Sequence, residues 1–256
     1  MPLLSADNVG KVFGGLTAVK GFTLSMEPGE MVGLIGPNGA GKTTVFNLLT
    51  GFFPPTTGSI VFDGVDVTGY KAWQVAQQGM VRTFQNIRMF SSLTVLDNLK
   101  TAQHFRTGYG LAEAVLRLPR YFSEEKRIHA DCMRLLEHLE LDGVAGEIAG
   151  SLPYGYQKRL EIARALSVRP KLLLLDEPAA GLNPTETREL LARLTSIRKE
   201  FGLAMLLIEH DMKFVMGICE RILVLVYGET IAQGLPEEIR KNPQVLEAYL
   251  GTEDHS

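Results

Sequence analysis

The sequence predicts an α/β fold on a parallel sheet, with an antiparallel β segment at the N-terminus and an inserted helical lobe. Three observations carry this prediction. Residues 1–35 alternate apolar and polar positions between turn signals. Residues 91–141 have helical spacing without strands, and after residue 156 helical stretches alternate with wholly apolar runs. Wholly apolar strands between helices are typical of a parallel sheet covered on both faces.

In the N-terminal third of the chain, the sequence pattern predicts short strands on both sides of a glycine-rich loop. Turn signals at Gly14-Gly15 and Pro28-Gly29 divide the first 35 residues into short strands that end with MVGLI, 31–35. The loop GPNGAGKTT follows, and VFNLLTGF then has helical spacing. Residues 56–68 predict a further strand pair around Asp63-Gly64.

The remainder predicts the helical lobe and the rest of the sheet. Pro119 interrupts the helical pattern between Ser91 and Leu141. A helix from Tyr156, the strand LLLLD, a helix over 185–201, the strand AMLLIEH and a final strand pair follow in that order. We expect one domain, 1–256, in which 1–88 and 160–256 form the core and 89–159 form the lobe.

Composition narrows the function classes. The 256 residues carry a net charge of −3 with both signs intermixed, which argues against a nucleic-acid partner because phosphate neutralisation needs a basic face. Cys132 and Cys219 lack metal-like spacing, so we expect buried, reduced thiols. The N-terminus does not resemble a signal peptide, and no apolar run approaches the roughly 18 residues of a membrane span. We expect a partner to mediate any work at a membrane.

The loop GPNGAGKTT, 36–44, fits the pattern G-x-x-x-x-G-K-[ST] and lies between a predicted strand and a predicted helix. In this context, glycines let backbone N–H groups turn toward phosphate oxygens, and the helix adds its positive end. Lys42 would neutralise the β- and γ-phosphates of a bound nucleotide, and the Thr43 hydroxyl would bind Mg²⁺. The predicted nucleotide-binding residues of the loop are Gly36, Asn38, Gly39, Gly41, Lys42, Thr43 and Thr44.

Two carboxylates follow the leucine-rich strand. Asp176 ends four consecutive leucines and should leave the sheet at its C-terminal edge, where ligands bind in open α/β sheets. A carboxylate there would hold Mg²⁺. Glu177, one residue further, would orient or polarise the attacking water.

The order of motifs resembles that of an ABC ATPase over nearly the whole chain. The phosphate loop, LPYGYQKRLEIARAL, LLLLDEPAAGLNP and LLIEHD carry the resemblance. The segments VRTFQNIRMFSSLTVLDNL, IEHDMKFVMGICERILVL and NPQVLEAYLG resemble the ATP-binding subunits of branched-chain amino-acid importers. Within the superfamily, a transporter for lipid export stays an alternative, as does a soluble ABC ATPase of cluster assembly.

The resemblance implies an ATPase with defined partners. ATP and Mg²⁺ would be held in a head-to-tail dimer with a second ATPase subunit, a copy of this chain or a paralogue. Closure and opening of this dimer would drive transmembrane permease subunits. A periplasmic substrate-binding protein would be an indirect partner. The chain would lie peripherally on the cytoplasmic face of the inner (plasma) membrane.

The resemblance also implies roles for single residues. Gln85 matches a glutamine that touches Mg²⁺ and water, and His210 matches a histidine that contacts the γ-phosphate. Phe13 matches the aromatic residue that stacks on adenine, although a core aromatic at a strand end is the open alternative. Asn183 stands where the family has aspartate, so the contact across the dimer there would keep its hydrogen bond and lose its charge.

The signature segment departs from the family pattern L-S-G-G-Q. In LPYGYQ only Leu152 and Gly155 match, and Pro153 replaces the serine whose hydroxyl reaches the partner's γ-phosphate. We expect a helix to start here, with Ser151 as its cap, so that N–H groups from Gly155 onward meet phosphate. The signature would then be functional but would bind ATP weakly. The alternative is that Pro153 only starts a helix and the site needs no hydroxyl.

The stretch from Arg88 to Leu93 is the predicted groove for a permease helix. Its surroundings are rich in aromatic and Met side chains, too many for a purely solvated lobe. Packing of the lobe's own small core is the alternative. The residues concerned are Met89, Phe90, Phe105, Tyr109, Tyr121 and Phe122.

Overall fold

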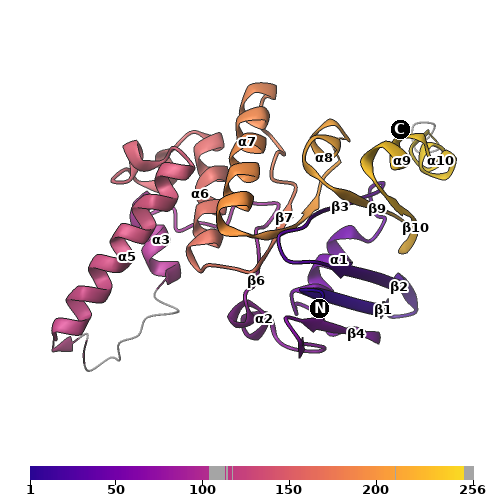
Figure 1. The fold of residues 1–256 in the computed structure, drawn as a ribbon, viewed down its shortest axis with the longest axis horizontal. Helices are drawn as coiled ribbons and strands as arrows, with labels where there is room; N and C mark the ends of the chain where they lie inside the picture. The colour runs from indigo at the N-terminus through magenta and orange to yellow at the C-terminus, as the bar shows by residue number, and fades with distance from the viewer. Residues whose placement is uncertain (104–112, 114, 117, 211, 251–256) are drawn as a thin grey trace. The chain divides into compact units, whose positions relative to one another are not determined.

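The computed structural model describes residues 1–103, 113, 115–116, 118–210 and 212–250 (Figure 1). The chain forms two compact units. Unit 1 consists of Met1–Arg82, Lys171–Ala180 and Leu194–Ser256, and unit 2 of Thr83–Pro170 and Gly181–Arg193. Phe105 and Tyr109, predicted near the partner groove, lie outside the described residues.

Unit 1 contains a six-stranded sheet in the order β10-β9-β3-β8-β7-β6. The pairs β9–β3, β3–β8, β8–β7 and β7–β6 are parallel, and β10 pairs antiparallel with β9. Every residue of β3, β7 and β8 is buried, which explains their unbroken apolar sequences and confirms the predicted parallel sheet. The strands are β3 (Met31–Ile35), β6 (Met80–Arg82), β7 (Leu172–Asp176), β8 (Ala204–Ile208), β9 (Arg221–Val226) and β10 (Glu229–Gly234).

A second sheet of unit 1 is antiparallel, with the order β2-β1-β4-β5. Its hairpin turns fall at Gly14-Gly15 and Asp63-Gly64, where the sequence predicts them. This sheet confirms the predicted N-terminal β segment. Its strands are β1 (Leu4–Phe13), β2 (Leu16–Met26), β4 (Thr57–Phe62) and β5 (Val65–Asp66).

Helix α1 joins the two sheets of unit 1 into one core. Phe46 of α1 belongs to a buried cluster with Phe22 and Phe62 of the antiparallel sheet and with Leu34 and Leu174 of the parallel sheet. Burial of such side chains contributes roughly 1.5–3 kcal/mol each. The helices of unit 1 are α1 (Lys42–Leu49), α2 (Ala72–Gln78), α8 (Met212–Ile218), α9 (Pro236–Lys241) and α10 (Pro243–Leu250), with residues 194–201 of α7 (Pro184–Phe201).

Unit 2 is helical over its described residues. Its helices α3 (Val95–Gln103), α5 (Pro119–His138) and α6 (Tyr154–Ser167) contact one another, and residues 184–193 of α7 complete it. Pro119 begins α5, in the first turn where its fixed φ suits a helix. Short 3₁₀ turns lie at Asp142–Val144 and Ala149–Ser151. The inserted helical lobe is thereby confirmed, while its division at 89–159 stays a prediction.

Two further sequence predictions concern burial and hydropathy. Cys132 and Cys219 are both free and buried, as predicted, and burial raises the pKa of each thiol to about 12. Among the described helices, none is both long enough and apolar enough to cross a bilayer.

Candidate nucleotide-binding site

The phosphate loop begins where the buried strand β3 ends. Gly36 has φ 152°, and a Cβ there would lie 2.0 Å from the carbonyl oxygen of Leu225 in β9, so no other residue fits. The backbone then turns through Gly39 and Gly41, both with positive φ, into α1. The first N–H groups of a helix lack intrahelical partners, and the helix dipole adds positive potential there. The loop and the start of α1 thus form an anion-binding element.

Lys42 is held inside this loop. Its side chain is 8% exposed, and its Nζ donates to the carbonyl oxygens of Gly36, at 2.7 Å, and Pro37, at 2.9 Å. Burial lowers the pKa of Lys42, and the carboxylates of Glu177 and Asp176 oppose that shift. The Lys42 ammonium therefore lies within electrostatic range of both carboxylates that the sequence singled out. Asn38, Gly39 and Thr43 are exposed beside it.

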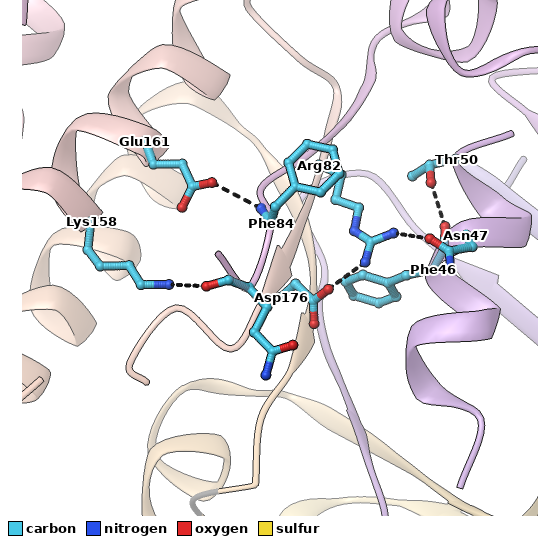
Figure 2. A network of polar contacts seen from close by, with 9 residues as sticks. Phe46, Asn47, Thr50, Arg82, Phe84, Lys158, Glu161 and Asp176 are labelled. Atoms are coloured by element: carbon cyan, nitrogen blue, oxygen red, sulfur yellow. Dashed lines mark hydrogen bonds and ion pairs between the residues drawn. The ribbon is translucent and has the colours of Figure 1, made fainter. Parts of the chain in front are cut away.

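Asp176 ends β7 and is paired with an arginine that sequence reasoning missed. Its Oδ2 accepts from Arg82 Nη2 at 2.5 Å, and Arg82 Nη1 donates to Asn47 Oδ1 at 2.6 Å. Both side chains of the ion pair are nearly buried, and the guanidinium lies over the ring of Phe46 (Figure 2). Arg82 ends β6, which pairs in parallel with β7, so Arg82 and Asp176 stand at the carboxyl ends of neighbouring strands. A basic residue at the end of a short strand was the signal that could have identified Arg82.

Glu177 adopts a left-handed backbone conformation, with φ 47°. This conformation is uncommon for a residue with a side chain and occurs at sites where the surroundings impose it. Here the Glu177 N–H donates to the Ile208 carbonyl of β8 at 2.9 Å, and its own carbonyl accepts from Ala180 N–H at 3.1 Å. The turn after β7 is thereby fixed to the neighbouring strand.

Glu209 is a second buried acid that sequence reasoning missed. It is 1% exposed, and its carboxylate accepts from the N–H groups of Ala179, at 2.8 Å, and His210, at 3.3 Å. Burial raises its pKa, and these hydrogen bonds oppose the shift. The sequence signal that could have identified Glu209 was an acidic residue directly after the buried strand β8, which is parallel to β7. His210 itself is largely exposed, with Nδ1 3.8 Å from Glu209 Oε2.

Because β3, β7 and β8 are parallel, the segments that follow them meet at one edge of the sheet. That edge of unit 1 brings together the phosphate loop, Asp176–Glu177 and Glu209–His210. The donor set of loop N–H groups, one ammonium, hydroxyls and a carboxylate fits a Mg²⁺–nucleoside triphosphate.

Phe13 lies at the hairpin of β1 and β2 and is 39% exposed, which overturns the core alternative. Its ring meets that of Phe53 edge-on, with centroids 5.4 Å apart. Lys11 Nζ lies 5.1 Å from the Phe13 centroid and donates to the Pro54 carbonyl at 2.6 Å. The sequence analysis did not predict Phe53 or Lys11 as neighbours of Phe13. Nothing in the segment GFFPP, 51–55, indicates that the Phe53 ring meets the Phe13 ring.

The signature segment in unit 2 begins a helix, as expected from the sequence, but α6 starts at Tyr154, two residues before the predicted start at Tyr156. Pro153 is its N-cap, with φ −54° and ψ 151°, one position earlier than the first turn. The expected cap role of Ser151 is wrong, because its hydroxyl donates to the Ile148 carbonyl at 2.8 Å within a 3₁₀ turn. Gly155 is buried, and a Cβ there would lie 2.8 Å from Glu186 Oε1.

Asn183 caps α7 in unit 2. Its Oδ1 accepts from the N–H groups of Thr185, at 2.9 Å, and Glu186, at 3.0 Å. In return, the Glu186 carboxylate accepts from Asn183 N–H at 2.9 Å. This is a capping box, and the sequence N-P-T-E carried its signal.

Gln85 belongs to unit 2 and follows the end of β6. It is exposed, and its backbone carbonyl accepts from Lys158 Nζ at 3.1 Å. The family resemblance had singled out Gln85, whereas Lys158 was not predicted. The other two predicted Mg²⁺ ligands, Thr43 and Asp176, belong to unit 1.

The fold and the site of unit 1 define a P-loop nucleotide-binding protein. The family profile described as "ABC transporter" matches residues 19–180, and the profile "Branched-chain amino acid ATP-binding cassette transporter" matches residues 229–255. The chain belongs to the ATP-binding subunits of ABC transporters. That family hydrolyses ATP, so the protein is an ATPase.

Relatives and solved structures agree with this assignment. The chain is 46% identical over 250 residues to the high-affinity branched-chain amino acid transport ATP-binding protein BraF of Pseudomonas aeruginosa, covering 98% of each chain. It is 48% identical to the corresponding protein LivG of Escherichia coli K12, with the same coverage. The ADP conformation of MJ1267, an ATP-binding cassette of an ABC transporter, superposes with a TM-score of 0.85 at 30% identity, covering 98% of this chain and 99% of that one.

Proposed function

We propose that this chain is the ATP-hydrolysing subunit of an importer for branched-chain or other hydrophobic amino acids. The buried Lys42 ammonium of the phosphate loop, with Asp176 and Glu177 at the same edge of the sheet, is the observation that carries the ATPase site. The names of the BraF and LivG relatives support the substrate class and favour amino-acid transport over lipid export or cluster assembly.

Each predicted residue has a proposed role at that site. The loop N–H groups and Lys42 bind the phosphates, and Phe13, with Phe53 and Lys11 beside it, offers a surface for the adenine. Thr43, Asp176 and Gln85 would hold Mg²⁺, which supplies charge neutralisation at the phosphates. Glu177 orients the attacking water as general base, and His210 contacts the γ-phosphate. The remaining nucleotide contacts are Gly36, Asn38, Gly39, Gly41 and Thr44.

The working unit is a head-to-tail dimer with a second ATPase subunit, either a copy of this chain or a paralogue. Lys42 of one subunit and Gly155 of the other would enclose one ATP, with Asn183 contacting across the dimer. The start of α6 offers N–H groups but no hydroxyl at Pro153. We therefore expect the signature side of the site to bind ATP weakly.

The chain would lie on the cytoplasmic face of the inner (plasma) membrane, bound to transmembrane permease subunits. Phe90 is 47% exposed beside the exposed Arg88, which supports a docking surface at residues 88–93 rather than core packing. A periplasmic substrate-binding protein would act through the permease. We expect no nucleic-acid partner, because the chain carries a net charge of −3.

Co-expression with the candidate permease subunits tests this function. We expect the chain to copurify with them and to support ATP-dependent uptake of leucine into reconstituted vesicles. Phe90→Asp should abolish copurification and uptake while ATP binding stays intact. Phe201→Asp, which charges an equally exposed phenylalanine in unit 1, is the control and should retain both. Phe90→Asp protein that also loses ATP binding would contradict the docking role.

A further inference from the structure

The backbone around Gln85 is held by buried side chains of unit 2. We call residues 83–90 the Gln85 segment. Glu161 of α6 accepts from the N–H groups of Phe84, at 3.1 Å, and Arg88, at 3.4 Å. Lys158, one turn earlier, donates to the Gln85 carbonyl at 3.1 Å. The backbone atoms on both sides of the Gln85 side chain are therefore bonded to one helix.

These two charges are almost fully buried. Lys158 is 1% exposed and Glu161 is 3% exposed. Burial raises the pKa of Glu161, and its bonds to the Gln85 segment and the charge of Lys158 oppose the shift. Charged groups this deep are costly, and apolar residues of similar size often stabilise a core as well or better. Packing alone therefore does not explain why α6 carries them.

The same buried face of α6 carries the signature. Gly155, Lys158 and Glu161 follow one another at intervals of three residues, and all three are buried. At the far end of the segment, the side chain of Asn98 pairs with the N–H and carbonyl of Phe90, at 2.9 and 3.0 Å. The segment is thus bonded at both ends within one unit.

We propose that Glu161 and Lys158 are positioning residues that fix the Gln85 segment to the signature helix, so that Gln85 and Gly155 move together. This inference rests on the proposed function, in which Gln85 and Gly155 serve nucleotide. A partner helix that displaces Phe90 would then displace both groups at once. The two residues act through the backbone of Gln85 and touch no substrate.

Amide hydrogen exchange on the purified full-length chain tests the contact without relying on ATP. Glu161→Ala should speed exchange at Phe84 and Arg88, and Glu161→Gln, which keeps an acceptor oxygen, should restore part of the protection. Glu140→Gln is the matched control, because Glu140 is an exposed carboxylate of the same unit paired with Arg193. Unchanged exchange in Glu161→Ala would overturn the proposal.

A double-mutant cycle tests whether Glu161 acts through Gln85. We expect Glu161→Ala to lower kcat by about 10- to 100-fold, as loss of a group that orients a ligand does. In a Gln85→Ala background, the same substitution should lower kcat no further. An equal loss in both backgrounds would overturn the positioning role. If the wild-type chain splits no ATP, the proposed function fails, and the exchange comparison alone decides the inference.

Discussion

The phosphate loop and the signature segment both present the start of a helix, but they are built differently. Helix α1 starts after Gly41 in a left-handed conformation and contributes the ammonium of Lys42. Helix α6 starts after Pro153 in an extended conformation and contributes no hydroxyl. The loop combines N–H groups with a full charge, whereas the signature relies on N–H groups and the helix dipole. This difference predicts tight binding at the first element and weak binding at the second.

The largest expected effect comes from removing the charge of the phosphate loop. Lys42→Ala should lower kcat by about 10²–10³-fold, because a preorganised cationic donor to the transferred phosphoryl group is lost. ATP binding should weaken as well. Steady-state ATPase assays and nucleotide titration measure both effects. Lys20→Ala removes an exposed lysine paired with Glu229 and should change neither quantity. Near wild-type turnover in Lys42→Ala would contradict a role of Lys42 in ATP hydrolysis.

A second test compares one glycine from each element. In Gly36→Ala the new methyl group would meet a backbone carbonyl at 2.0 Å, whereas in Gly155→Ala it would meet the movable Glu186 carboxylate at 2.8 Å. Overpacking against backbone costs about 1–3 kcal/mol, while displacing Glu186 from its cap costs about 0.5–2 kcal/mol. Thermal unfolding should show Gly36→Ala with the lower Tm, at about 2–4 °C per kcal/mol. The reverse order would mean that the signature is the more rigid element.

The smallest expected effect is a gain at the signature. Pro153→Ser restores a hydroxyl at a backbone conformation that serine favours as a helix cap. One charge-assisted hydrogen bond is worth about 1.5–3 kcal/mol, so ATP-dependent dimerisation or turnover should rise by about tenfold or more. Pro153→Ala removes the ring without adding a hydroxyl and should show no gain. An unchanged rate with an intact fold would favour the alternative that this site needs no hydroxyl.

The sequence predicted the parts whose signals are local. Four leucines before Asp176 predict a buried strand, and the glycine pattern at 36–44 predicts the phosphate loop. What the sequence could not predict depends on contacts between distant segments. The pairing of Arg82 with Asp176 needs β6 beside β7, and the bonds of Glu161 need α6 beside the Gln85 segment.

Local signals also failed in one place. Ser151 has the residue type of a helix cap, yet its hydroxyl serves the preceding 3₁₀ turn and Pro153 takes the cap position. A serine three positions before the first residue of a helix can bond backward as readily as forward, and single-residue propensities do not distinguish these choices.

Dimerisation of the Glu177→Gln protein tests the central claim most directly, which is that a signature with Pro153 in place of serine still completes an ATP site. This variant should bind ATP without splitting it, and gel filtration should show a shift from monomer to dimer when ATP and Mg²⁺ are added. Such a shift would support a site closed by two copies of this chain. A protein that binds ATP by titration yet stays monomeric would contradict the claim and require a second ATPase chain or the permease subunits to complete the site.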